Sequence, residues 1–176
     1  MKKICVFTGA ASGNSPLYRE RAVQLGKMIS ERGFGLVYGG GSRGLMGSVT
    51  DGVIKNGGPV VGVIPKFLEK VEIAHSGITD LRIVETMHER KALMYDLSDA
   101  FVIMPGGLGT LDEAMEIITW RQLGVHNKPV IIANIDRYWD PLLSLFQNII
   151  DKGFMHHGKR GHFEVAETLD CIFEKI

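Results

Sequence analysis

Residues 100–120 carry the sequence AFVIMPGGLGTLDEAMEIITW, in which an apolar run passes through a glycine-rich turn into a segment with helical spacing. A strand, a tight turn and a helix in this order form the repeating unit of α/β proteins. The turn PGGLGT (105–110) leads into a helix start, where unpaired amides and the positive end of the helix dipole favour an anionic ligand. Yet the first turns of this helix carry Asp112, Glu113 and Glu116. The stretch predicts an anion-binding turn, and it raises the question of what three carboxylates do beside it.

The same unit recurs along the whole chain. The apolar runs that predict strands are ICVFTG (4–9), GLVYGGG (35–41), PVVGVIP (59–65), LRIVET (81–86), AFVIMPGG (100–107) and KPVIIANI (128–135). The segments with a helical pattern are 15–33, 45–58, 88–99, 108–123 and 141–152. Most of the strands are nearly continuous in Val and Ile, which is typical of parallel strands buried on both faces. The sequence therefore predicts an α/β fold, a doubly wound parallel sheet with helices on both faces, as a single domain over residues 1–176.

The local signals at the ends of the first helix agree with this assignment. Ser15 is expected to be the N-cap, with Pro16 at the first helical position and Gly33 as the stop.

Composition excludes several classes of protein. With 45% hydrophobic and 23% charged residues, the chain resembles an ordinary soluble globular domain. A formal net charge of zero argues against coating nucleic acid or an anionic membrane. The N-terminal apolar run is too short for a signal peptide and no stretch is long enough to span a bilayer, so a cytoplasmic location is expected. Cys5 and Cys171 show no Cys-x-x-Cys spacing, and we expect one of them to be core and the other partly covered.

Three glycine-bearing turns follow strands, and ligands of doubly wound sheets bind at such turns. They are TGAASG (8–13), GGGSRGLMG (39–47) and PGGLGT (105–110). Gly39, Gly41 and Gly44 match the dinucleotide fingerprint formally. The match follows the second strand, however, and the next strand ends in Pro65 and Lys66 where a ribose-binding acid is expected. NAD binding is therefore not predicted. Since the turns hold more glycine than turning requires, close approach of the backbone to a ligand is expected.

The third turn favours a monophosphate. The amides of Gly107 to Thr110 lead into a helix start, and the Thr110 hydroxyl can cap the helix or bond the ligand. No Gly-Lys-Ser/Thr follows, as it does in the loops that bind nucleoside triphosphates.

Acidic and basic residues suggest the chemistry. Glu113 and Glu116 share a helix face, so a carboxylate would stand about a ribose ring away from the phosphate, while Asp112 has a simpler explanation in the helix dipole. Cleavage of an N-glycosidic bond builds positive charge on the anomeric carbon, which a carboxylate can stabilise. Arg90 and Lys91 oppose the dipole of their own helix, so an anionic neighbour is expected.

The histidines of HHGKRGH (156–162) lack a completing acid, so a solvated loop and no metal site are expected there.

These motifs together resemble those of the Lonely guy family, the cytokinin riboside 5′-monophosphate phosphoribohydrolases. The family pattern P-G-G-x-G-T-x-x-E is matched by Pro105, Gly106, Gly107, Gly109, Thr110 and Glu113. The segment M-H-x-R-K is matched by Met87, His88, Arg90 and Lys91, and the loop Y-G-G-G-x-x-G-L-M-G by residues 38–47. The resemblance extends from about residue 3 to Phe154, and the tail after it departs from the family pattern.

The resemblance implies a Rossmann-like subunit that works as a homodimer without a metal or redox cofactor. It implies hydrolysis of AMP or an N6-prenylated AMP to free base and ribose 5-phosphate, with Arg90 and Glu113 as the catalytic pair. The residues expected to bind substrate are Glu72, Met87, Lys91, Gly106, Gly107, Leu108, Gly109, Thr110, Gly40 and Gly41.

Two other functions remain open at this level. A non-catalytic carrier of a nucleotide or cofactor would need the glycine turns but no carboxylate beside the sugar. A lysine decarboxylase, the older label of the family, would need a pyridoxal-phosphate lysine, and no lysine stands in a convincing context for one. The preferred base also stays open, because the sequence does not indicate whether the region of Met87 and Leu93 lines an apolar pocket.

Overall fold

A computed structural model describes residues 1–69, 75, 77–155 and 162–176. These residues form a seven-stranded sheet in the order β4-β3-β2-β1-β5-β6-β7, and every pairing is parallel. The strands are β1 (Lys3–Phe7), β2 (Gly35–Tyr38), β3 (Val60–Pro65), β4 (Asp80–Val84), β5 (Ala100–Ile103), β6 (Val130–Ala133) and β7 (Glu164–Ala166). The predicted doubly wound α/β sheet is confirmed.

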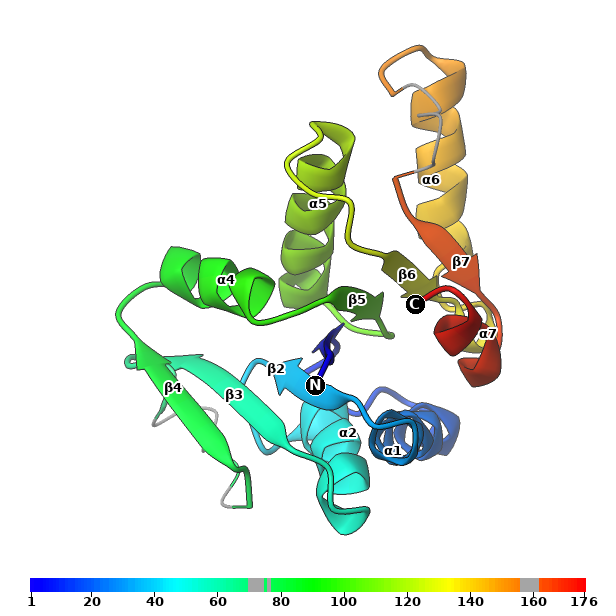
Figure 1. Cartoon of the computed structure of the whole chain (residues 1–176). Helices are drawn as coiled ribbons and strands as arrows, with labels where there is room; N and C mark the ends of the chain where they lie inside the picture. The colour runs from blue at the N-terminus through cyan, green and yellow to red at the C-terminus, as the bar shows by residue number, and fades with distance from the viewer. Residues whose placement is uncertain (70–74, 76, 156–161) are drawn as a thin grey trace.

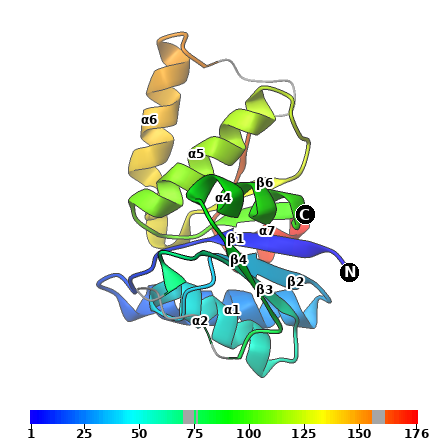
Figure 2. The ribbon, with the colours of Figure 1, turned by 90° about the vertical axis from the view of Figure 1, so that its left-hand side faces the viewer.

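Helices cover both faces of the sheet (Figures 1 and 2). They are α1 (Pro16–Glu31), α2 (Gly44–Lys55), α4 (Met87–Asp96), α5 (Leu108–Gln122), α6 (Asp140–Asp151) and α7 (Leu169–Glu174), with a 3₁₀ turn, η1 (Ile135–Arg137), before α6. Figure 1 shows α1 and α2 beneath the sheet and α4, α5 and α6 above it. Because successive strand residues point to opposite faces, Ile4 and Val6 pack with α1, α2 and α7, whereas Cys5 and Phe7 pack with α4, α5 and α6. The core is thus two apolar layers separated by the sheet.

The first helix begins and ends as its sequence predicts. The Ser15 side chain accepts a hydrogen bond from the Leu17 amide, and Pro16 occupies the first helical position. Gly33 follows the last helical turn with φ at +75°, a conformation that glycine adopts without strain.

Two glycines let α1 and α2 cross closely. A Cβ atom on Gly26 would meet the carbonyl oxygen of Val49, and one on Gly52 would meet that of Val23. The backbones therefore touch at this crossing, and side chains larger than hydrogen are excluded from it.

The C-terminal residues add two elements that the sequence pattern did not predict. β7 pairs with β6 as the last strand, with Val165 beside Ile132, and α7 buries Leu169 and Ile172 in the core. The predicted loop 156–162 lies outside the described residues except for His162.

Among the described residues, no helix combines the length and the apolar character that crossing a membrane requires. The two cysteines are as expected, since Cys5 is buried and Cys171 is partly covered.

The strand order places a crevice beside β1. The chain builds outward from β1 through β2 and β3 to β4, then returns through α4 to β5 on the other side of β1. Loops at the carboxyl ends of β1 and β5 therefore diverge to opposite faces, which opens a ligand site in such sheets.

Candidate active site

A cavity of about 460 Å³ lies at this point of the sheet. The turn after β1 (residues 8–13), the PGGLGT turn after β5 and the beginnings of α1, α2, α4 and α5 line it. Its volume is in the range of cavities that hold small-molecule ligands.

The PGGLGT turn forms one wall and ends at the start of α5. Gly107 is the N-cap of α5 and supplies no side-chain cap. The Thr110 hydroxyl fills the space beside Gly106 that a Cβ atom there would need. The Pro105 carbonyl accepts hydrogen bonds from the Gly9 amide at 3.1 Å and from the Thr8 hydroxyl at 3.0 Å, so the turns after β1 and β5 are joined. The helix start that the sequence assigned to an anion thus lies at the cavity wall.

Glu113 and Arg90 bring opposite charges into the cavity. Both are nearly buried, with 9% of Glu113 and 5% of Arg90 exposed. One Arg90 Nη donates a hydrogen bond of 3.0 Å to the Gly39 carbonyl. The buried Nε–H of Arg90 has no acceptor in the part of the chain that the structure describes. A buried guanidinium with a spare donor is suited to holding a ligand oxygen or nitrogen.

The pKa of Cys5 reflects the same pair of charges. Burial raises the pKa of this thiol well above its usual value, Glu113 adds to the rise, and Arg90 opposes it. The charges of Glu113 on α5 and Arg90 on α4 therefore both reach Cys5 on β1, the strand beneath the cavity.

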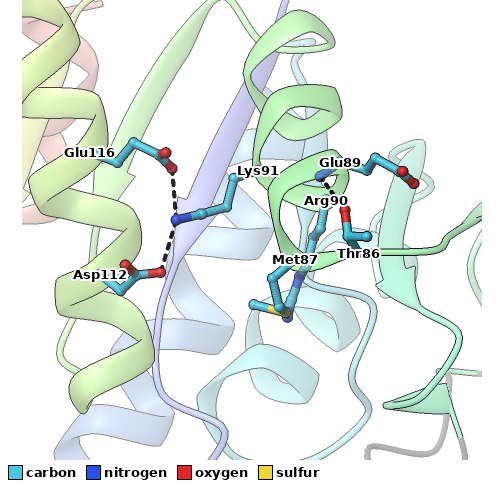
Figure 3. A network of polar contacts seen from close by, with 7 residues as sticks. All are labelled: Thr86, Met87, Glu89, Arg90, Lys91, Asp112 and Glu116. Atoms are coloured by element: carbon cyan, nitrogen blue, oxygen red, sulfur yellow. Dashed lines mark hydrogen bonds and ion pairs between the residues drawn. The ribbon is translucent and has the colours of Figure 1, made fainter.

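The three acids of α5 have two different roles. Glu113 lines the cavity, whereas Asp112 and Glu116 point to Lys91 on α4 (Figure 3). The Lys91 ammonium lies 3.1 Å from an Asp112 oxygen and 3.0 Å from a Glu116 oxygen. Partial burial lowers the pKa of Lys91, but its hydrogen bonds to Glu116 and Asp112 outweigh that effect and raise it. Two of the carboxylates near the anion-binding turn thus share one ammonium and are directed away from the cavity.

Two tyrosines that sequence analysis did not identify also line the cavity. The rings of Tyr18 and Tyr138 meet edge to face at 5.7 Å, and the Tyr138 hydroxyl donates a hydrogen bond of 2.6 Å to the Gly106 carbonyl. Asp136 and Arg137 take φ values of 53° and 58°, a left-handed turn that directs Tyr138 to the PGG segment. The signal available in the sequence concerned Tyr138 alone, an aromatic residue shortly after a buried strand, because Tyr18 lies inside α1.

Most of the predicted site residues gather at this cavity. Those that line it are Met87, Arg90, Gly106, Gly107, Gly109, Thr110 and Glu113. Leu108 points away and is 85% exposed, and Lys91, Gly40 and Gly41 lie outside the lining. Glu72 lies outside the described residues.

The glycines of residues 39–47 mainly serve packing between loops. The Arg90 guanidinium takes the place of a Gly39 side chain, and the backbone of Ala10 lies against Gly44. This loop supports the cavity by seating Arg90, and its Leu45 and Met46 reach the lining.

Metal ligands do not cluster in the described ranges: no three His, Cys, Asp or Glu side chains there are placed to hold an ion.

Comparison with known proteins gives a consistent result. The family model described as "Possible lysine decarboxylase" matches residues 46–176, so the match continues through the tail to Ile176. A cytokinin riboside 5′-monophosphate phosphoribohydrolase of Oryza sativa subsp. japonica is 48% identical over 175 residues, which cover 99% of this chain and 72% of that protein. One of Arabidopsis thaliana is 50% identical over 154 residues, covering 88% and 71%.

A solved structure extends the likeness of fold. The molybdenum cofactor binding protein of Rippkaea orientalis superposes with a TM-score of 0.74 at 22% identity, covering 99% of this chain and 94% of that one. At this identity the similarity concerns the fold alone.

Proposed function

This chain belongs to the Lonely guy family of cytokinin riboside 5′-monophosphate phosphoribohydrolases, and from that membership we propose that it is an N-glycosidase acting on nucleoside 5′-monophosphates. It hydrolyses the bond between base and ribose and releases free base and ribose 5-phosphate. The observation that carries the proposal is the joint presence of buried Glu113 and Arg90 in a cavity closed at one wall by the α5 N-terminus. AMP and N6-modified AMP are the substrates that we expect.

The phosphate occupies the start of α5. Amides of the PGGLGT turn and the helix dipole favour the dianion, with Gly106, Gly107, Gly109 and Thr110 as its contacts. This placement directs the ribose toward Glu113, one turn further along the helix.

Bond cleavage follows from the charges in the cavity. As the base departs, positive charge develops on the anomeric carbon, and the Glu113 carboxylate stabilises it or activates the attacking water. Water supplies the hydroxyl that replaces the base, and the departing base gains the proton. Arg90, whose Nε–H is unused by the protein atoms described, holds the substrate and assists departure of the base.

Other expectations remain predictions. Met87 lines the cavity and is a candidate contact for the base. The substrate-binding role of Glu72 rests on the family resemblance alone, and so do those of Leu108, Gly40 and Gly41, which the cavity lining leaves out. The cytoplasmic location also stays a prediction.

A homodimer is proposed on the same family basis. Its support in the molecule is apolar surface on and after the long helices α5 and α6: Leu123 just beyond α5, Leu145 on α6 and Phe154 just beyond α6 are all exposed. Side chains of this kind are commonly covered in oligomers.

The test of the activity compares four substrates. Purified protein is incubated with AMP, N6-isopentenyl-AMP, adenosine and ATP, and the products are separated by chromatography. We expect base release from the monophosphates alone. Glu113→Gln and Arg90→Met should each lower kcat/KM by about a hundredfold or more, since each removes transition-state stabilisation. Glu20→Gln, at an exposed position of α1, is the control that should keep full activity.

A different outcome would favour a carrier. If the wild-type protein binds AMP in calorimetry and releases no base from any substrate, the glycosidase proposal is contradicted.

A further inference from the structure

Lys91 forms a bridge between two helices that each carry a member of the catalytic pair (Figure 3). It lies on α4, and both of its carboxylate partners, Asp112 and Glu116, lie one turn apart on α5. Only 12% of the Lys91 side chain is exposed, so its alkyl chain is packed between the helices while its ammonium contacts both carboxylates.

The bridge lies next to the proposed catalytic residues in the sequence. Lys91 follows Arg90, and Asp112 precedes Glu113. Because each pair shares a helical backbone, a change in the distance between Lys91 and Asp112 moves Arg90 relative to Glu113.

The beginning of α4 is itself fixed, so the bridge starts from a rigid point. The Thr86 hydroxyl accepts a hydrogen bond of 3.1 Å from the Glu89 amide, and the Glu89 carboxylate accepts one of 2.8 Å from the Glu85 amide. These two side-chain hydrogen bonds, one to the N-cap and one to the residue before it, leave little freedom in the first turn. Further along the two helices, Tyr95 and Trp120 make an edge-to-face contact at 5.2 Å. The Lys91 bridge therefore adds a polar connection between α4 and α5, one turn or less from Arg90 and Glu113 in the sequence.

We propose that Lys91 is a positioning residue, a role that rests on the proposed function. Its ammonium connects α4 to α5 and sets the separation of Arg90 and Glu113. Family resemblance predicts Lys91 as a ligand of the substrate instead. The contacts oppose that role, since the ammonium is bound to two carboxylates and Lys91 lies outside the cavity lining.

The two roles predict different kinetics. A substrate ligand lost in Lys91→Met raises KM, whereas a lost positioning residue lowers kcat and leaves KM nearly unchanged. Replacing both carboxylate partners of Lys91 by neutral amides distinguishes a substrate ligand from a positioning residue further. Asp112→Asn with Glu116→Gln frees the Lys91 ammonium, which preserves a ligand but breaks the bridge.

The experiment measures kcat and KM with AMP for wild type, Lys91→Met, the Asp112→Asn/Glu116→Gln protein and the protein with all three changes. We expect kcat to fall about tenfold or more in each variant, because small displacements of reacting groups are costly, with KM within about threefold of wild type. The triple variant should lose no more than Lys91→Met alone, since one bridge is removed in both. Lys27→Met, which removes an exposed lysine paired with Glu31 on α1, should match wild type.

The positioning role of Lys91 can fail while the proposed glycosidase activity stands, and the outcomes distinguish the two. A rise in KM at unchanged kcat in Lys91→Met, or wild-type kcat in the Asp112→Asn/Glu116→Gln protein, overturns the positioning role. Losses that multiply in the triple variant overturn it too. If Lys91→Met does not fold, the Asp112→Asn/Glu116→Gln protein decides alone, because Asp112 is largely exposed. Absence of base release by the wild-type protein would instead contradict the proposed function.

Discussion

Gly39 matters because Arg90 occupies the space that a side chain would take. A Cβ atom at this position would meet the terminal nitrogen of the Arg90 guanidinium. We expect Gly39→Ala to displace that group and to lower kcat/KM with AMP by about a hundredfold. The displaced atom belongs to the flexible end of a side chain, so the midpoint of thermal unfolding should change little. Steady-state kinetics and a melting curve on the same sample test this.

Gly33→Ala is the contrasting substitution. Gly33 has open space around it but a φ of +75°, so alanine there is strained without touching the cavity. It should cost about 1 kcal/mol of unfolding free energy and leave kcat/KM unchanged. If Gly39→Ala also lowers stability and leaves kcat/KM unchanged, the packing of the Arg90 guanidinium against Gly39 is not important for catalysis.

His126 is expected to make stability depend on pH. The residue is buried, its Nε2 lies 3.1 Å from the Ile117 carbonyl oxygen, and its Nδ1 accepts a hydrogen bond from the Lys128 amide. Burial lowers the pKa of His126 from the ordinary value of 6.5, and the nearby Lys128 and Arg121 contribute to the fall. As the pH falls, His126 therefore takes up a proton at a higher pH in the unfolded chain than in the folded protein. The contribution of His126 is complete above about pH 6.5 and is lost as the pH falls from there toward the lowered pKa.

Urea unfolding on the acidic side of neutrality measures this effect. The free energy of unfolding should fall less steeply with acidification in His126→Gln than in wild type. His88→Gln, at an exposed histidine, should keep the wild-type slope. Equal slopes in all three proteins would contradict the assignment to His126.

Part of the site was predictable from single residues and part was not. The anion-binding PGGLGT turn follows from the physics of a helix start, which depends on local sequence. The same reasoning left Glu113 and Glu116 as alternatives for the carboxylate, and the family resemblance selected Glu113. Tyr18 and Tyr138 could not be found in this way, because only the strand order brings their segments to one cavity. Gly40 and Gly41 were indistinguishable in sequence from phosphate-binding glycines, yet the cavity lining leaves them out.

At the level of elements, the crossing of α1 and α2 depends on the absence of side chains at Gly26 and Gly52. Alanine is favoured over glycine inside a helix by about 1 kcal/mol. Here the added methyl group would meet a backbone carbonyl oxygen, which cannot move unless the helices part. We expect Gly26→Ala and Gly52→Ala each to destabilise the protein by about 1–3 kcal/mol, measured from denaturant midpoints.

The exposed surface of the same helix provides the control. Lys27→Ala should change the unfolding free energy by less than about 0.5 kcal/mol, since it removes only a surface ion pair with Glu31. Stabilisation by either glycine substitution would show that the helices adjust at no cost.

The elements themselves were largely predictable, and the exceptions have a physical reason. Buried strands such as β5 and β6 are continuous apolar runs, and their helices begin at recognisable turns. β7 has only three residues and includes an acid, so its strand character comes from pairing with β6. α7 has six residues, and its single strong signal is the Thr168 hydroxyl that caps the Cys171 amide.

For the whole molecule, the proposed dimer predicts a solution mass of about twice the 19.4 kDa of one chain. Phe154 is 84% exposed just after α6, and Leu145 is exposed on the same helix. Leu145→Glu combined with Phe154→Glu should shift the protein toward monomer, because charges do not tolerate burial in an apolar contact. Light scattering after size exclusion measures the mass.

Phe67→Glu is the matched control, since Phe67 is exposed in the turn after β3 and belongs to neither α5 nor α6. It should keep the wild-type mass. A wild-type protein that is monomeric at all concentrations used in the activity assay would remove the dimer from the proposal.

The position of β1 between β2 and β5 also governs when a binding site can exist during synthesis. β1 pairs with β2 across a short separation, whereas the Lys3 amide meets the Asp99 carboxylate 96 residues later. Such distant pairing closes late, because a long loop must be ordered before its contacts form. An emerging chain thus lacks the PGGLGT turn and Glu113 until β5 and α5 have left the ribosome. Nucleotide added during refolding is therefore expected to prolong the life of the finished protein and not to hasten its formation.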